Sequence, residues 1–175
     1  VCGVCGPIVW AFRCVVLWVG LTAFPPLFFL GLRFLAIALV LVPFVKKPTP
    51  QEFGPVAVIS VFLGGLNFGL FYVGLGLGSG SMSAVAYQLA TPFTILLAWP
   101  LLEERPSVIT SGGVLLACLG VVVLAAGPGL SANAIPILLV VGAAFAFAVA
   151  NVLTKRHGPF DPLMLTGWCS LFTVP

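Results

Sequence analysis

Pro25–Phe34 reads Pro-Pro-Leu-Phe-Phe-Leu-Gly-Leu-Arg-Phe and opens an apolar run that continues to Val45. Such a run is long enough to cross a bilayer as a helix, because about 20 apolar residues span the hydrocarbon core. Arg33 lies inside the run. A charge at such a depth costs roughly 2.5–3.5 kcal/mol on insertion scales, so we expect Arg33 to face other helices or a water-filled cavity.

The composition of the whole chain indicates that lipid is its solvent. Of 175 residues, 61% are hydrophobic and only 6% are charged, whereas a soluble domain carries about 25% charged residues. In lipid each backbone polar group must be satisfied within its own segment, which a helix achieves. The segments lack the alternation of polar and apolar residues that barrel strands require. The predicted fold class is therefore an all-α integral membrane protein with about seven transmembrane helices. The predicted segments are Val4–Gly20, Pro26–Val45, Pro55–Leu77, Ser83–Leu102, Val108–Ala126, Ala134–Leu153 and Pro162 to the end of the chain.

The connections between these segments differ in charge. Those at Lys46–Glu52, Glu103–Pro106 and Lys155–Gly158 are charged, whereas the other three connections carry no charge. If each segment crosses once, the charged connections and the N-terminus lie on the same side of the membrane. Basic residues in short loops mark the cytoplasmic side. We therefore predict a cytoplasmic N-terminus in a multi-pass protein of the plasma membrane, which is the inner membrane in a bacterium.

A short pattern in the opening stretch occurs twice. Pro26-Leu27-x-x-x-Gly31 returns as Pro162-Leu163-x-x-x-Gly167, five segments later and again at the start of an apolar segment. A repeat with an odd number of spans is inverted in its second copy, and many secondary transporters are built in this way. We predict that residues 1–130 form a first repeat of five helices. Residues 131–175 would be the start of a second, inverted repeat.

Three stretches carry a family resemblance. Pro25–Phe34, the run Gln88-Leu89-x-x-Pro92-Phe93-Thr94 and the pair Glu104-Arg105 resemble the EamA-type drug/metabolite transporter superfamily, and the resemblance extends from about Val9 to Pro175. It implies ten helices in two inverted five-helix repeats, with both termini in the cytoplasm. It also implies movement of small metabolites, many of them amino acids and their relatives. This chain would then hold about seven of the ten helices, and three would be missing.

The chain departs from the family pattern at four positions. In many members the first helix reads Trp-Gly-x-Asn-Phe, with a Lys a little further on; here Trp10 is kept, but Ala11 replaces the Gly, Arg13 the Asn and Trp18 the Lys. Glu103 stands where a Gly usually precedes Glu-Arg. A second buried cation at Arg13 favours a more anionic ligand. Asn151 matches the second repeat's version of the first-helix Asn.

Several polar and aromatic residues within the segments are candidates for the transport path. Arg33 could hold a substrate carboxylate or a gating carbonyl; the alternative is a structural arginine bonded to helix carbonyls or reaching the surface. Polar side chains such as Asn67 and Gln88 could orient a substrate, although hydrogen bonding between helices is the alternative role. Tyr72 and Trp10 are expected as aromatic walls. The full predicted path comprises Arg33, Arg13, Asn67, Gln88, Tyr72, Trp10 and Asn151.

Proline and glycine residues suggest how the segments bend and pack. Pro92 and Pro100 are expected to interrupt the fourth segment, as in the kinked helices of transporters. Gly65-x-x-x-Gly69 and Gly74-x-x-x-Gly78 are expected to allow close contact between helices.

These features predict a secondary transporter that exports or exchanges a small polar, amino-acid-like metabolite by alternating access. The alternatives are a non-transporting membrane subunit or scaffold, and a fragment that is inactive alone. An enzyme is not expected, since His-Glu-x-x-His, Gly-x-x-x-x-Gly-Lys and Gly-x-Ser-x-Gly signatures are missing. We expect no catalytic residue, cofactor or metal. The expected partners are a small-molecule metabolite and the lipid bilayer, with a homodimer as an option, and no nucleic acid.

Overall fold

The computed structural model describes residues 25–45, 47–103, 106–125, 130–158 and 160–173. Within these ranges every regular element is helical, which confirms the predicted fold class. One of the elements, η1, is a π-helix and continues directly from α3 into α4. The elements are α2 (Pro26–Leu41), α3 (Pro50–Ser60), η1 (Val61–Phe68), α4 (Gly69–Leu77), α5 (Gly80–Tyr87), α6 (Ala90–Leu102), α7 (Val108–Ala125), α8 (Leu130–His157) and α9 (Pro162–Thr173).

Three helical rods are long and apolar enough to cross a membrane. They are Pro50–Leu77 with 28 residues, Gly80–Leu102 with 23 residues and Ala134–His157 with 24 residues. Shorter apolar helices occupy Leu30–Leu41 and Val108–Val123. Many large apolar side chains remain exposed, notably along α7, as expected where lipid covers the surface. The described chain is that of a multi-pass membrane protein.

At two ends, helices extend beyond the predicted segments to charged residues. The third segment begins at Pro50 rather than Pro55, because Glu52 Oε2 accepts hydrogen bonds from the backbone N–H and the hydroxyl of Thr49, both over 2.8 Å. Such a capping box satisfies donors at a helix N-terminus. α8 continues to His157, with Lys155 and Arg156 in its last turn. Cations are favourable at that end of a helix dipole.

The predicted fourth segment is divided into α5 and α6 by a turn at Gln88 and Leu89. Pro92 explains this turn, because its ring lacks an N–H and would clash with the carbonyl group of the residue four positions earlier, Gln88. At the turn the hydrogen bonds reach three residues back rather than four: the N–H of Leu89 donates to Ala86 O over 3.2 Å, and the N–H of Thr91 donates to Gln88 O over 3.3 Å. The prediction of an interruption is thus confirmed for Pro92. It is wrong for Pro100, since α6 runs through it to Leu102.

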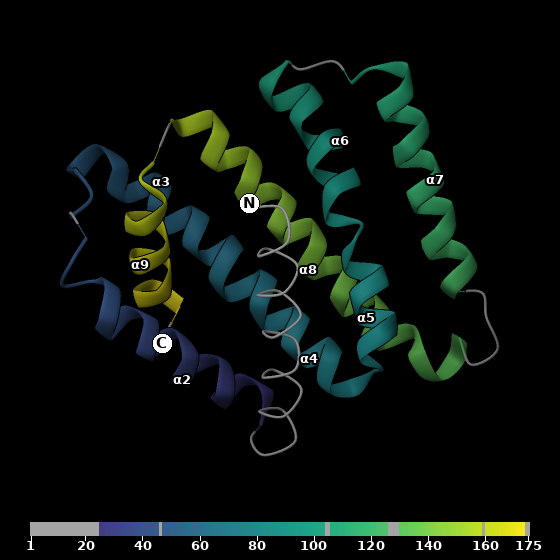
Figure 1. Ribbon diagram of the computed structural model, residues 1–175, viewed down its shortest axis with the longest axis horizontal. Coiled ribbons are helices and arrows are strands. Elements are labelled where there is room, and N and C mark those ends of the chain that lie inside the picture. The colour runs from purple at the N-terminus through teal and green to yellow at the C-terminus, as the bar shows by residue number, and fades with distance from the viewer. Residues whose placement is uncertain (1–24, 46, 104–105, 126–129, 159, 174–175) are drawn as a thin grey trace, which may run out of the picture.

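Figure 1 shows α8 running diagonally through the middle of the described bundle, where it packs against α3, η1, α4, α5, α6 and α7. Its buried face is built largely of alanines, which allow neighbouring backbones to approach closely. On the other side of α3 and η1, α9 packs against α2. The buried alanines of α8 are Ala143, Ala144, Ala146, Ala148 and Ala150.

One of the two predicted glycine pairs lies at a close helix contact. A Cβ atom added to Gly74 would be 2.8 Å from Val140 Cγ2, and one added to Gly78 would be 2.8 Å from Pro136 Cβ. This pair therefore packs on α8 as predicted. Around Gly65 and Gly69, by contrast, an added Cβ would meet no described atom within 4 Å.

The ends of the helices separate by charge. In Figure 1 the α2–α3, α6–α7 and α8–α9 connections follow the upper and left side of the bundle. The α4–α5 connection, the C-terminal end of α7 and the start of α8 lie at the opposite, lower right side. The three charged connections of the sequence therefore share one end of the bundle, as single crossings require.

Candidate transport site

The π-helical segment η1 sets the position of Asn67. π-Helices are rare and occur frequently at functional sites, and this one contains the glycine pair Gly64-Gly65, which weakens regular helix formation. Asn67 is only 1% exposed, and its Nδ2 donates a hydrogen bond to Leu63 O over 3.2 Å. The segment thus presents a polar amide to the interior of an apolar bundle.

Tyr87 on α5 binds this amide. Its hydroxyl donates a hydrogen bond to Asn67 Oδ1 over 2.9 Å and so joins α5 to η1. The chain reaches this position because α4 ends at Leu77, and Ser79 then caps α5 by accepting a hydrogen bond from the N–H of Met82. The sequence prediction did not include Tyr87. A tyrosine in an apolar segment is a usable signal, because a buried hydroxyl generally needs a partner.

Arg33 on α2 contacts η1 and α4, the second half of the continuous helix Pro50–Leu77. Its Nη1 donates a hydrogen bond to the Tyr72 hydroxyl over 2.9 Å, and its Cζ lies 5.4 Å from the ring centre of Phe68. Tyr72 is fully buried and Arg33 is half-buried. No buried side-chain nitrogen or oxygen among the described residues lacks a hydrogen-bond partner. Among the described residues, the contacts of the Arg33 guanidinium are thus a hydrogen bond to Tyr72 and a ring contact with Phe68.

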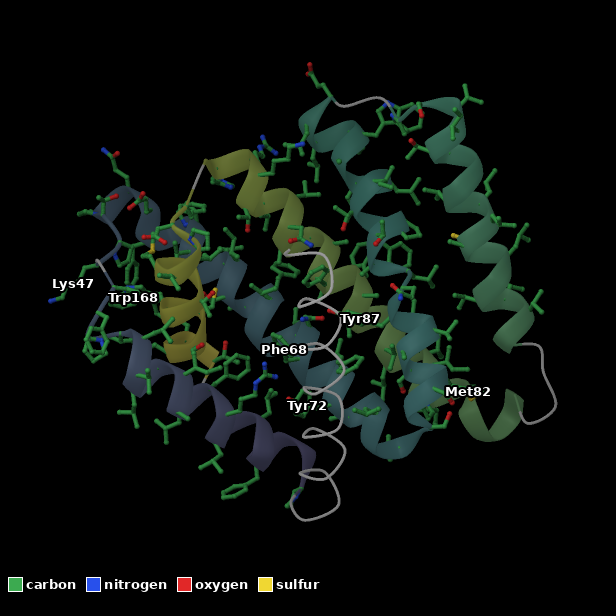
Figure 2. All side chains as sticks on the ribbon, in the orientation of Figure 1. Lys47, Phe68, Tyr72, Met82, Tyr87 and Trp168 are labelled. Carbon is green, nitrogen blue, oxygen red and sulfur yellow. The ribbon has the colours of Figure 1, made fainter. Side chains whose placement is uncertain are left out.

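A row of aromatic rings connects the two hydrogen-bonded pairs. Phe71 lies 6.4 Å from Tyr72 and 4.9 Å from Tyr87, measured between ring centres. Figure 2 shows Phe68, Tyr72 and Tyr87 in the middle of the described bundle, between α2 and α5. We call these rings the aromatic row. Its members, in order of contact, are Phe34, Phe68, Tyr72, Phe71, Tyr87 and Phe147.

The structure brings three of the predicted path residues into one region, namely Arg33, Tyr72 and Asn67. Gln88 lies elsewhere, since it is exposed at the turn between α5 and α6. Asn151 is half-buried on α8.

Arg13 and Trp10 lie outside the described residues. An open surface hollow at the end of α6 is lined by Leu96, Trp99, Pro100 and Glu103, so it involves none of the path residues.

No Asp or Glu lies within any of the membrane segments predicted from the sequence. The chain has four acidic residues, and all of them occur at or beside the charged connections: Glu52, Glu103, Glu104 and Asp161. The part of the chain that the structure describes also contains no group of three His, Cys, Asp or Glu residues able to hold a metal ion. The site therefore combines one cation, two tyrosine hydroxyl groups, one amide and aromatic walls.

Comparison with known proteins gives this arrangement a context. Residues 1–126 match the model of the EamA-like transporter family. A probable amino-acid metabolite efflux pump of Salmonella typhimurium is 30% identical over 178 aligned residues, and its Escherichia coli counterpart is 29% identical over 174. These alignments cover 95% of this chain and 58% of each pump.

An uncharacterised transporter of Bacillus subtilis is 33% identical over 141 residues, which cover 77% of this chain and 46% of that protein. This chain thus spans a little more than half of the two pumps' length. No solved structure matches it.

Proposed function

Because this chain belongs to the EamA-like transporter family, we propose that it exports or exchanges a small polar, amino-acid-like metabolite by alternating access. Its relatives in two enterobacteria are described as probable amino-acid metabolite efflux pumps, which supports this substrate class. Membership in a family of transporters also supports the prediction that the chain is not an enzyme.

The observation that carries the proposal is the placement of Arg33. It lies seven residues into α2, so it is about 10 Å along the helix axis from Pro26. A cation at such a depth faces the bundle interior or a water-filled cavity and marks a substrate pathway by default. Tyr72 holds one of its N–H groups, and the remaining accessible donors can bind a substrate carboxylate.

The other members of the site complete the proposed path. The pair formed by Asn67 and Tyr87 offers hydrogen-bonding groups, and the aromatic row forms a wall that excludes water. The proposed path also includes Gln88, Asn151, Arg13 and Trp10, of which Gln88 is exposed and Arg13 and Trp10 lie outside the described residues.

The proposed membrane arrangement follows the repeat pattern. Residues 1–130 form the first repeat, and residues 131–175 begin the inverted second repeat; the family match that ends at residue 126 supports this division. The N-terminus lies in the cytoplasm and the protein resides in the inner membrane, which agrees with the common end shared by the charged connections.

Flux measurements test the proposal. Proteoliposomes containing the chain are loaded with radiolabelled amino acids, and release is compared with release from protein-free vesicles. We expect release above that background and a loss of about tenfold or more with Arg33→Gln, because a charge-assisted hydrogen bond is removed. Arg156→Gln, at an exposed arginine at the end of α8, is the matched control and should retain flux. Absence of flux, or an Arg33→Gln variant as active as its control, contradicts the proposal.

A further inference from the structure

We infer that the site around Arg33 selects for net negative charge: it takes carboxylate anions in preference to zwitterionic amino acids and rejects cations. This inference rests on the proposed function and specifies the substrate class of the same site. The preferred ligand would then carry a net negative charge, whereas most amino acids are zwitterions without net charge near pH 7.

The first step is the charge of the membrane interior. Arg33 is a cation within α2, and each of the four acidic residues of the whole chain lies at or beside a charged connection. Buried charges are generally paired or hydrogen-bonded, because desolvation of an isolated ion is costly. A carboxylate of this chain's membrane segments cannot provide the pairing. A bound anion can.

The second step is the geometry at the guanidinium group. The Tyr72 hydroxyl accepts one hydrogen bond, and the ring of Phe68 faces the planar group at 5.4 Å. These two contacts hold the fork of donors in a fixed orientation without neutralising its charge. Arginine binds carboxylates through two parallel N–H bonds, which gives geometric specificity as well as affinity. The site is thus prepared for a carboxylate.

The third step concerns the ammonium group of a zwitterion. In an α-amino acid this group is attached one carbon atom from the carboxylate, so it would lie close to the Arg33 cation. The amide oxygen of the candidate site, Asn67 Oδ1, already accepts the hydrogen bond of Tyr87. Repulsion from one cation without a compensating carboxylate is an element that lowers affinity for the wrong ligand. Acylation of the amine removes this repulsion and leaves the carboxylate intact.

An anionic group for Arg33 could also come from a membrane lipid. The phosphate of a lipid headgroup is also an anion, and Arg33 is about 10 Å from the start of its helix. We assign the site to a soluble carboxylate. The experiment below separates the two sources.

The test uses the full chain purified in detergent and three compounds that share one side chain. Leucine is zwitterionic, N-acetylleucine is an anion and leucinamide is a cation. We expect N-acetylleucine to raise the melting temperature most and to bind about tenfold more tightly than leucine, whereas leucinamide gives no shift. Equal shifts for all three, no shift for any of them, or a preference for leucinamide overturn the inference.

Variants assign the preference to Arg33. Arg33→Gln should abolish the shift with N-acetylleucine, and Arg156→Gln should leave it unchanged. Should Arg33→Gln fail to fold, Arg33→Lys keeps the charge and should keep the anion preference with weaker binding, because an ammonium group lacks the bidentate fork. Loss of the preference in the exposed Arg156→Gln control would overturn the assignment.

Two further arms separate the explanations. A water-soluble short-chain phosphatidylglycerol that stabilises the protein and is not displaced by N-acetylleucine identifies a lipid site and overturns the inference. In proteoliposomes, leucine flux without preference for N-acetylleucine overturns the inference alone. Absence of flux for all three compounds overturns the proposed function, while the binding order in detergent still decides the inference.

Discussion

Tyr87 on α5 and Asn67 on η1 are joined by a hydrogen bond of 2.9 Å, twenty residues apart in the chain. The bond crosses the glycine-containing junction between α4 and α5 and fixes the direction in which α5 leaves it. Asn67 is almost fully buried, so water has little access to its amide oxygen and the Tyr87 hydroxyl serves as the hydrogen-bond donor. The pair therefore links the π-helical turn to the broken fourth segment.

A double-mutant cycle measures this link. Tyr87→Phe and Asn67→Leu should each destabilise the protein, and the double variant should lose less than the sum, with a coupling of about 1 kcal/mol. Unfolding in mixed micelles with increasing dodecyl sulfate provides the measurement. Ser111→Ala, at a hydroxyl that donates only to Ser107 O in the same helix turn and shares no contact with the pair, is the control. Additive losses would show that the bond contributes no specific stability.

Removal of the Tyr72 hydroxyl should weaken substrate binding more than folding. Tyr72→Phe retains the ring within the aromatic row but deprives the Arg33 guanidinium of its acceptor. Hydrogen bonds to charged groups contribute about 1.5–3 kcal/mol, so the apparent KM for export should rise about tenfold or more. Concentration-dependent flux from proteoliposomes gives KM, and Trp99→Phe at an exposed aromatic side chain is the control. An unchanged KM would show that the Tyr72 hydroxyl does not position Arg33 for substrate binding.

Gly74→Ala should destabilise the bundle by about 1–3 kcal/mol, because the added methyl group overlaps Val140 Cγ2 and the backbone oxygen of Pro136. Gly120→Ala on α7 is the matched control, since its added Cβ meets no described atom within 4 Å. It should be neutral or stabilising by up to about 1 kcal/mol, the ordinary gain for alanine over glycine in a helix. Melting temperatures in detergent compare the two variants. Equal changes in melting temperature for the two variants would contradict a close helix contact at Gly74.

Glu103→Gly should stabilise the protein by about 1 kcal/mol. Glu103 ends α6 with a φ of 57° and a ψ of 19°, which is the left-handed conformation that glycine adopts without steric cost. The same geometry accounts for the glycine that the family pattern usually has at this position. Glu103→Ala removes the charge but keeps the strained conformation, so it should give no comparable gain. A gain of equal size with alanine would assign the effect to charge instead.

Much of the fold could be predicted from the sequence because lipid leaves few solutions. The apolar runs predicted helices, and Pro92 predicted a break in the fourth segment. The regular alternation of charged and uncharged connections predicted that successive segments cross the membrane in opposite directions. Exact helix ends were less predictable. Thr49 and Glu52 extend α3 into the charged connection through local hydrogen bonds, and the same polar residues are equally compatible with a loop.

The candidate site was predictable only in part. Arg33, Asn67 and Tyr72 were recognisable as polar or amphipathic side chains within apolar runs, where burial needs a partner. The sequence does not distinguish Tyr87 from its neighbour Gln88 as a site residue, because side-chain identity does not reveal which face of a short helix is inward. The turn at Gln88 rotates that amide to the surface and leaves Tyr87 directed at Asn67.

Composition and patterning were enough to identify this protein as a helical membrane bundle whose predicted membrane segments carry cationic but no acidic side chains. These properties follow from composition and from the need to satisfy each backbone group within its own segment. Which polar groups meet depends on how the helices pack against one another. The π-helical turn rotates the residues that follow it, Tyr72 among them, about the helix axis, and Tyr72 meets Arg33 of α2. The α4–α5 junction then redirects the chain, and Tyr87 of α5 meets Asn67.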